Sequence, residues 1–333
     1  CALGEALVAV DQRNHGNSFR ADQHGYQLGP PRTWEECDAI SAFLTGKTGM
    51  TGQKMYGNGN MLSPFWGLSI FYGRLASMAN PNFYWFDDDA FKTRFFDAMS
   101  LLFPEGEKFF IQCVRDFRDR IDDPELAAQV RAFTYQEGQH GRAHNAYNAR
   151  IAAQGVAVDK IVQQEKRVLA WLRRKLPATF TIAHTAAVEH ATAIMAHGFM
   201  AHPQVFAAAD PRMRALYVWH GVEEIEHKGV AFDVMQKVAA VGYGPRALMM
   251  LYVSIMFPLH TFLVMRHMFE VDRLPRRGRA WVRGLWWLYG PRGLMTRLLP
   301  HYLAYYRPGF HPWQAGNTRA YARWREVFEG SGG

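Results

Sequence analysis

The sequence contains little cysteine and no cysteine motif. Its three cysteines are Cys1, Cys37 and Cys113, an odd number without any Cys-x-x-Cys pair. Neither a disulfide framework nor a thiolate metal site is therefore indicated. Free thiols favour a reducing compartment, and we expect a cytoplasmic protein. No secretory h-region is present. The chain begins at Cys1 rather than Met, so the sequence leaves open whether a segment precedes Cys1.

Two common catalytic signatures are also missing. The chain has no Gly-x-Ser-x-Gly nucleophile elbow and no His-Glu-x-x-His zinc motif. Residues 7–10 indicate a short buried strand, and the Asp-x-Arg-x-His-Gly-x-Ser sequence of residues 11–18 resembles a loop of the α/β-hydrolase family. We interpret residues 1–80 as a small irregular or α/β appendage without hydrolase chemistry of its own. Gly-rich residues 49–59 read as a linker.

The rest of the chain is typical of an all-α protein. The whole sequence of 333 residues is 49% hydrophobic, which is enough for a large core. Asp123-Pro124 and Asp210-Pro211 each combine an N-cap residue with proline at the first helical position. We expect four long helices with the longest connection between the second and third, which is the topology of a ferritin-like four-helix bundle with extra C-terminal helices. The predicted helices span residues 91–121, 124–153, 178–201 and 211–241.

Two Glu-x-x-His pairs lie in this helical region. They are Glu137–His140 and Glu224–His227, and His220 precedes the second pair to give His-x-x-x-Glu-x-x-His. Residues three and four apart share one face of a helix, so each set points in one direction. Such a pair on each of two helices, with a Glu on each of the other two, is typical of a two-metal site inside a four-helix bundle.

The remaining two helices offer one carboxylate each. Glu189 is flanked by alanines, and Glu107 competes with Glu105, which follows Pro104. Buried carboxylates are strongly disfavoured unless they are paired or bind metal. Carboxylate oxygens and imidazole suit two divalent ions, iron first, with manganese or zinc as alternatives. The expected ligands are Glu107, Glu137, His140, Glu189, His220, Glu224 and His227.

Several neighbouring side chains have more than one interpretation. His144 follows His140 by one turn and is either an eighth ligand or a residue that supports the ligands. Glu223 either faces outward or makes supporting hydrogen bonds. Asp116 and Asp233 are candidates for fixing the tautomers of the ligand histidines, because metal-bound imidazoles are commonly held through their second nitrogen.

Five segments carry a resemblance to a known family. They are residues 103–110 (FPEGEKFF), 136–140 (QEGQH), 188–190 (VEH), 219–228 (WHGVEEIEHK) and 306–313 (YRPGFHPW). Together they resemble the bacterial family of predicted metal-dependent hydrolases over about residues 83–315, leaving a tail at 316–333. The order of ligand types along the helices is also similar to that of the di-iron arylamine N-oxygenases. The resemblance implies a metal-dependent enzyme.

These observations support three hypotheses about function. The first is a dinuclear, carboxylate-bound metal enzyme, with iron favoured, that activates dioxygen to oxidise an unknown small-molecule or lipid-like substrate. The alternative is a hydrolase that uses a metal-activated water. The third is a metal-binding bundle without catalysis. Metal identity and oxygen reactivity distinguish the first two.

The C-terminal part combines arginine with tryptophan. Residues 246–300 hold most of the excess positive charge behind the net charge of +8, interleaved with tryptophans. This mixture is compatible with a solvated basic face beside the bundle or with peripheral contact with an anionic membrane, such as the inner face of the cytoplasmic membrane. No motif indicates nucleic acid. Residues 248–265 are nearly all apolar, and we expect a buried helix that packs on the bundle there, with membrane insertion as the alternative. A homodimer is also compatible with this composition.

Overall fold

The computed structural model describes residues 84–202, 205–274 and 276–314. These residues form eight α-helices and no strand, apart from one isolated bridge between Phe86 and Ala209, so the predicted all-α fold is confirmed. They belong to one compact unit, Ser69–Val327. The predicted appendage at residues 1–80 and the tail at 316–333 lie outside the described residues, and the domain boundaries stay a prediction.

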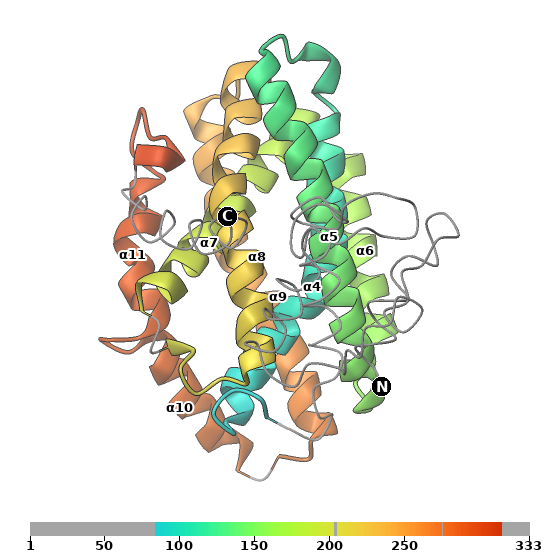
Figure 1. Ribbon diagram of the computed structural model, residues 1–333, viewed down its shortest axis with the longest axis vertical. Helices are drawn as coiled ribbons and strands as arrows, with labels where there is room; N and C mark the ends of the chain where they lie inside the picture. The colour runs from blue at the N-terminus through green and yellow to red at the C-terminus, as the bar shows by residue number, and fades with distance from the viewer. Residues whose placement is uncertain (1–83, 203–204, 275, 315–333) are drawn as a thin grey trace, which may run out of the picture. The chain divides into compact units, whose positions relative to one another are not determined.

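Four helices form the central bundle. α4 lies against α5 and α7 lies against α8, while smaller contacts join α5 to α8 and α4 to α7 (Figure 1). The connection between α5 and α7 contains α6, Val158–Lys175, which packs mainly on α4. The four bundle helices are α4 (Ala90–Arg115), α5 (Pro124–Ala153), α7 (Ala178–Ala201) and α8 (Pro211–Asp233).

The Asp-Pro signals begin two of these helices as predicted. The Asp123 carboxylate accepts from the backbone N–H of Glu125, and the Asp210 carboxylate accepts from that of Arg212. Proline at the first helical position costs no hydrogen bond, because that N–H would have no partner in the helix. The bounds of α5 and α7 agree with the predicted ranges.

Two predicted helix ends were wrong. α4 ends at Arg115 rather than at residue 121, because the Phe117 N–H bonds to the Val114 carbonyl and the chain tightens into a 3₁₀ turn, Arg118–Arg120. α8 ends at Asp233 and continues as a π-helical segment, Val234–Val238, rather than as an α-helix to residue 241. α4 runs as one helix through Pro104.

Three further helices cover the bundle. α9 (Tyr243–Val271) packs on α4 and α7, α11 (Leu294–Ala304) packs on α7, and α10 (Arg277–Tyr289) contacts α11 and α4. By length and composition alone α9 could cross a membrane, and 33% of its most apolar stretch is buried in the structure. The expectation of a buried helix at 248–265 was therefore wrong for one side of α9, which faces outward.

A buried ion network ties α4 to the ends of α5 and α9. The Arg94 guanidinium donates to Asp97 Oδ2 at 2.9 Å and to Asp272 Oδ1 at 2.5 Å. It also donates to Gln154 Oε1 at 2.7 Å. Asp97, which is 1% exposed, accepts in addition from the Tyr147 hydroxyl. A buried charge needs this degree of pairing, so the network fixes the end of the bundle where these helices meet.

Candidate metal centre

Each of the four bundle helices brings at least one expected metal ligand to the interior. All seven side chains are buried, with none more than 5% exposed. Their assignment as ligands stays a prediction, but the fold gathers them as that assignment requires. α4 carries Glu107, α5 carries Glu137 and His140, α7 carries Glu189, and α8 carries His220, Glu224 and His227.

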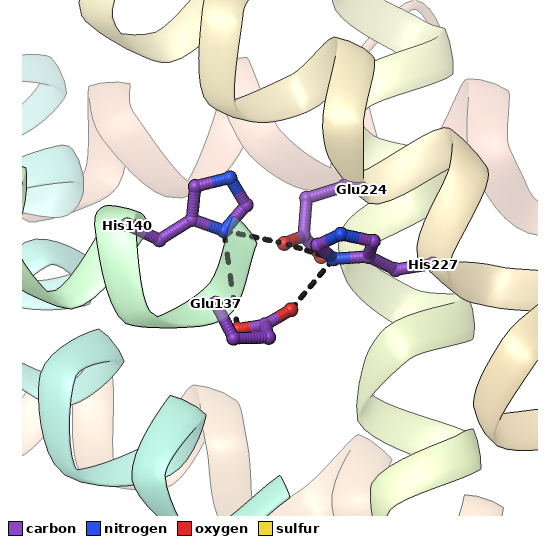
Figure 2. Close-up of side chains that lie close together, drawn as sticks. All are labelled: Glu137, His140, Glu224 and His227. Atoms are coloured by element: carbon purple, nitrogen blue, oxygen red, sulfur yellow. Dashed lines mark ion pairs between the residues drawn. The ribbon is translucent and has the colours of Figure 1, made fainter. Parts of the chain in front are cut away.

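The two Glu-x-x-His pairs form one tight group. Figure 2 shows their imidazoles and carboxylates turned toward one another. One ligand atom of each residue lies within 4.8 Å of those of the others. His227 Nδ1 lies 2.6 Å from Glu137 Oε1. Glu224 Oε1 lies 3.5 Å from His140 Nδ1 and 3.6 Å from His227 Nδ1. Donor atoms from α5 and α8 therefore converge on one point, where they could hold a metal ion.

A second group adjoins the first. Ligand atoms of Glu107, His144 and His220 also lie within 4.8 Å of one another. Glu224 connects the two groups, since its Oε1 is 3.0 Å from His220 Nε2. Glu189 Oε2 reaches the first group, 3.9 Å from His227 Nδ1. Glu107, His220 and Glu224 therefore offer ligand atoms beside the first group, which is the arrangement expected for a pair of metal ions.

Many of the oxygen and nitrogen atoms that could bind a metal in these groups lack a hydrogen-bond partner. Both carboxylate oxygens of Glu107, Glu137 and Glu189 are buried without a hydrogen bond in the described part of the chain. The inward Nδ1 atoms of His140 and His227 are in the same condition, although they approach carboxylates as ion pairs. A buried charged group without a partner is costly, and a cation would offset that cost. The residues present fit a metal centre.

The pKa values show how strongly the carboxylates interact. Burial raises the pKa of Glu107 and of Glu189 well above the usual range, and neighbouring carboxylates raise it further. Burial acts in the same direction on Glu137, but the facing His227 and His140 imidazoles together outweigh it and lower the pKa of Glu137. Burial alone would lower the pKa of His140, yet its contacts with glutamates raise it to about 10. Without metal, protons must balance the carboxylates, and metal ions would replace those protons.

The outer nitrogens of two histidines are held by polar side chains. His140 Nε2 lies 2.7 Å from Glu223 Oε2, and the Trp219 indole N–H donates to the other oxygen of Glu223. His227 Nε2 lies 3.0 Å from Gln136 Oε1. Carboxylate and amide oxygens only accept, so each Nε2 carries a proton. Against the effect of burial, glutamates raise the pKa of both imidazoles, and each Nδ1 would offer its lone pair to the interior once a metal replaces the proton held there.

His220 is held by a longer chain of hydrogen bonds that starts at Pro104. Proline has no N–H, so the carbonyl of Ser100, four residues earlier in α4, has no helical partner. The Asn148 side-chain N–H donates to that carbonyl at 2.9 Å. This contact turns Asn148 Oδ1 toward the Ser100 hydroxyl, which donates to it at 2.7 Å. The direction of the next hydrogen bond is then fixed.

This chain of hydrogen bonds ends at the metal centre. Because the Ser100 hydroxyl hydrogen is already used, its oxygen accepts from His144 Nδ1–H, 2.8 Å away. His144 Nε2 then accepts from His220 Nδ1–H at 2.7 Å. His220 keeps a lone pair on Nε2, 3.0 Å from Glu224 Oε1. A lone pair facing a carboxylate oxygen needs a cation between them, so this tautomer suits metal binding.

These contacts decide between the alternative interpretations. Both ring nitrogens of His144 are hydrogen-bonded, which favours the supporting role over an eighth ligand. Glu223 is buried and supports His140. Asp116 was assigned wrongly, because it pairs at the surface with Arg173 of α6. Asp233 holds His311, which is not an expected ligand. Glu105 makes an ion pair with Lys108 on the outer side of α4.

Sequence reasoning missed the partners that lie far away in the chain. Ser100, Asn148 and Gln136 were not singled out, because no spacing rule relates residues on different helices. The Thr192 hydroxyl, which donates to Glu224, was missed for the same reason. One signal was available, since a proline inside a helix frees the carbonyl four residues before it.

A comparison with protein families identifies a relationship over most of the chain. The family described as "Predicted metal-dependent hydrolase" matches residues 74–316. The chain belongs to this family. All seven expected ligands and the residues that orient them lie inside the matched region. No curated protein and no solved structure matches the chain.

Proposed function

We propose that this protein is an enzyme that uses two divalent metal ions in the interior of its helical bundle. The observation that carries the proposal is the set of buried, unbonded carboxylate oxygens of Glu107, Glu137 and Glu189, which face imidazole nitrogens. No ordinary core tolerates this charge without a counter-ion. The metal-dependent family supports the same conclusion.

The reaction that the family description supports is hydrolysis. A divalent metal supplies this chemistry by lowering the pKa of a bound water toward neutrality. The chain's own residues keep the donors oriented: Glu223 holds His140, and Gln136 holds His227. The chain of hydrogen bonds that runs from Asn148 through Ser100 and His144 holds His220. These partners are themselves buried, which limits the access of water to the outer sides of the ligands.

The donor set supports a second candidate, oxidation of an organic or lipid-like substrate with iron and dioxygen. Four carboxylates and three imidazoles suit iron or manganese at least as well as zinc. The order of these ligands along the four helices is similar to that of the di-iron arylamine N-oxygenases. This similarity concerns the ligands and does not extend to the substrate.

Reloading the metal-free protein with single metals separates the two candidates. We would add zinc, manganese or ferrous iron to separate samples. Each sample would be assayed for hydrolysis of a panel of carboxylic and phosphoric esters and for dioxygen consumption. Glu137→Gln tests dependence on the centre, and Glu105→Gln, on the outer side of α4, is the matched control.

Hydrolysis by the zinc or manganese form, lost in Glu137→Gln and kept in Glu105→Gln, would support the first candidate. Dioxygen consumption by the iron form, with the same dependence on Glu137, would support the second and contradict the first. Metal binding with neither activity would leave a metal-binding bundle. Activity that survives in Glu137→Gln would contradict both enzyme proposals.

A further inference from the structure

The exposed apolar side chains of this protein are concentrated in its C-terminal helices. Among the large apolar side chains that are exposed in the described residues, all but Trp171 lie between Tyr243 and Trp313. Exposed apolar residues scattered singly are normal on a protein surface, whereas a concentration on a few elements indicates a surface that meets a partner.

α10 has an apolar stripe on its outer side. Val282 and Trp286 are 71% and 68% exposed, and Leu285 and Tyr289 are also exposed. These four follow the spacing i, i+3, i+4, i+7, which places them on one face of the helix. The opposite face packs on the bundle, where Gly284 lies directly against the ring of Phe91. α10 therefore has one apolar face inside and a second one outside.

α9 carries a longer stripe of the same kind. Its exposed residues recur every three or four positions, on a face opposite the one packed on α4 and α7. No Asp, Glu, Lys or Arg occurs from residue 247 to residue 265. The stripe consists of Leu248, Leu251, Ile255, Leu259 and Leu263.

The segment that follows α9 and contains α10 and α11 is rich in arginine and lacks acidic residues. From Arg273 to Gln314 the chain contains eight arginines, all exposed, and no Asp or Glu. None of the eight forms an ion pair in the described part of the chain, although Arg283 shares a hollow with Asp87, Asp88 and Asp89 of the preceding loop. The eight are Arg273, Arg276, Arg277, Arg279, Arg283, Arg292, Arg297 and Arg307.

We propose that the outer faces of α9 and α10 dock on an anionic lipid surface. Trp286 and Tyr289 are suited to the headgroup region, the aliphatic residues to the acyl boundary, and the arginines to the phosphates of the lipids. α9 contacts the bundle along one side, so this is contact from one side of a bilayer rather than a span. A second copy of the chain is disfavoured as the partner, because its arginines would repel these.

Vesicle flotation of the full-length protein tests the proposal. The vesicles are phosphatidylcholine with phosphatidylglycerol, compared with phosphatidylcholine alone. The test variants are Trp286→Glu on α10 and Ile255→Glu on α9. Trp171→Glu on α6 is the matched control, since Trp171 is 49% exposed and lies outside the two stripes. None of these positions belongs to the metal centre, so the result is independent of metal loading.

We expect the wild type to float with the anionic vesicles. Its binding to them should be weaker by about tenfold or more in each test variant and unchanged in Trp171→Glu. Equal binding to neutral vesicles would overturn it, and so would equal loss in Trp171→Glu. Absence of flotation by the wild type would overturn it as well. If the wild type instead forms a dimer that Trp286→Glu dissociates, or retains RNA without floating, the partner is another protein copy or a nucleic acid and the proposal is wrong.

Discussion

His144 Nε2 accepts a hydrogen bond from His220 Nδ1 at 2.7 Å, 76 residues away in the chain. The direction of this bond follows from Pro104, which frees the Ser100 carbonyl for Asn148 and so fixes the Ser100 hydroxyl. A proline that would ordinarily weaken a helix thus sets the tautomer of a candidate metal ligand.

Removing the Ser100 hydroxyl from this chain of hydrogen bonds should weaken metal binding. Ser100→Ala leaves His144 Nδ1 without an acceptor, so His144 and His220 can exchange tautomers and place a proton on the inward Nε2 of His220. We expect metal affinity to fall about 10–100-fold, as for other partners of metal-bound histidines. Titration of the metal-free protein with zinc measures the change.

The control for this prediction is Ser254→Ala on α9, where a half-buried serine hydroxyl bonds a carbonyl of its own helix. Its zinc affinity should match the wild type. Nitrogen-15 NMR of the zinc-loaded wild type gives an independent readout, because His220 should carry its proton on Nδ1. A proton on Nε2 of His220 would contradict the assigned chain.

The choice between Glu107 and Glu105 gives a second prediction. Glu107 is buried beside Gly141, where an added Cβ would lie 3.0 Å from Glu107 Oε2, so glycine leaves room for this carboxylate. Glu107→Gln should reduce the metal content from about two ions per chain to about one. Glu105→Gln should leave it unchanged. Elemental analysis decides, and the reverse pattern would show that the ligand on α4 is Glu105.

The buried ion network predicts a large effect on stability far from the metal centre. Arg94→Met leaves Asp97 and Asp272 without their cation, and the free energy of unfolding should fall by about 3–5 kcal/mol. Arg118→Met removes an exposed pair with Asp119 and should cost at most about 1 kcal/mol. Urea unfolding measures both. A loss in Arg94→Met as small as in Arg118→Met would contradict the structural role of the network.

His184 predicts a pH dependence of stability. It is buried between the rings of Phe109 and Tyr252, and burial lowers its pKa to about 4. Between about pH 6.5, the usual His pKa, and about pH 4, the unfolded chain binds more protons than the folded one. The contribution of His184 to the free energy of unfolding is therefore present above about pH 6.5 and is lost as the pH falls toward 4.

The variant His184→Phe should remove this dependence. The loss of unfolding free energy between pH 7 and pH 5 should be about 2 kcal/mol smaller in His184→Phe than in the wild type, because phenylalanine does not titrate. Urea unfolding of the metal-free proteins at both pH values checks this. Identical pH profiles would show that His184 is protonated without cost in the folded state.

The bundle was predictable where local signals mark it. Asp123-Pro124 and Asp210-Pro211 fix helix starts through a side-chain cap and a proline ring, both of which act within one turn. Helix ends carry weaker signals. The 3₁₀ turn after Arg115 and the π segment after Asp233 depend on contacts that spacing does not reveal.

The candidate site was predictable only along each helix. The i, i+3 spacing identifies Glu137 with His140 and Glu224 with His227, because one helix determines which residues share a face. It says nothing of what meets that face from another helix. Ser100 and Asn148 are 48 residues apart, and their contact exists only once α4 lies against α5. The outward faces of α9 and α10 likewise required the packed structure, since periodicity does not distinguish a packed stripe from a free one.

Metal content per chain is the most direct test of the dinuclear centre. The full-length protein and Glu137→Ala would be purified in parallel and analysed for iron, manganese and zinc. We predict about two divalent ions per chain in the wild type and their loss in Glu137→Ala, because Glu137 faces both His140 and His227. A wild type without metal after reloading, or an undiminished content in Glu137→Ala, would contradict the dinuclear centre.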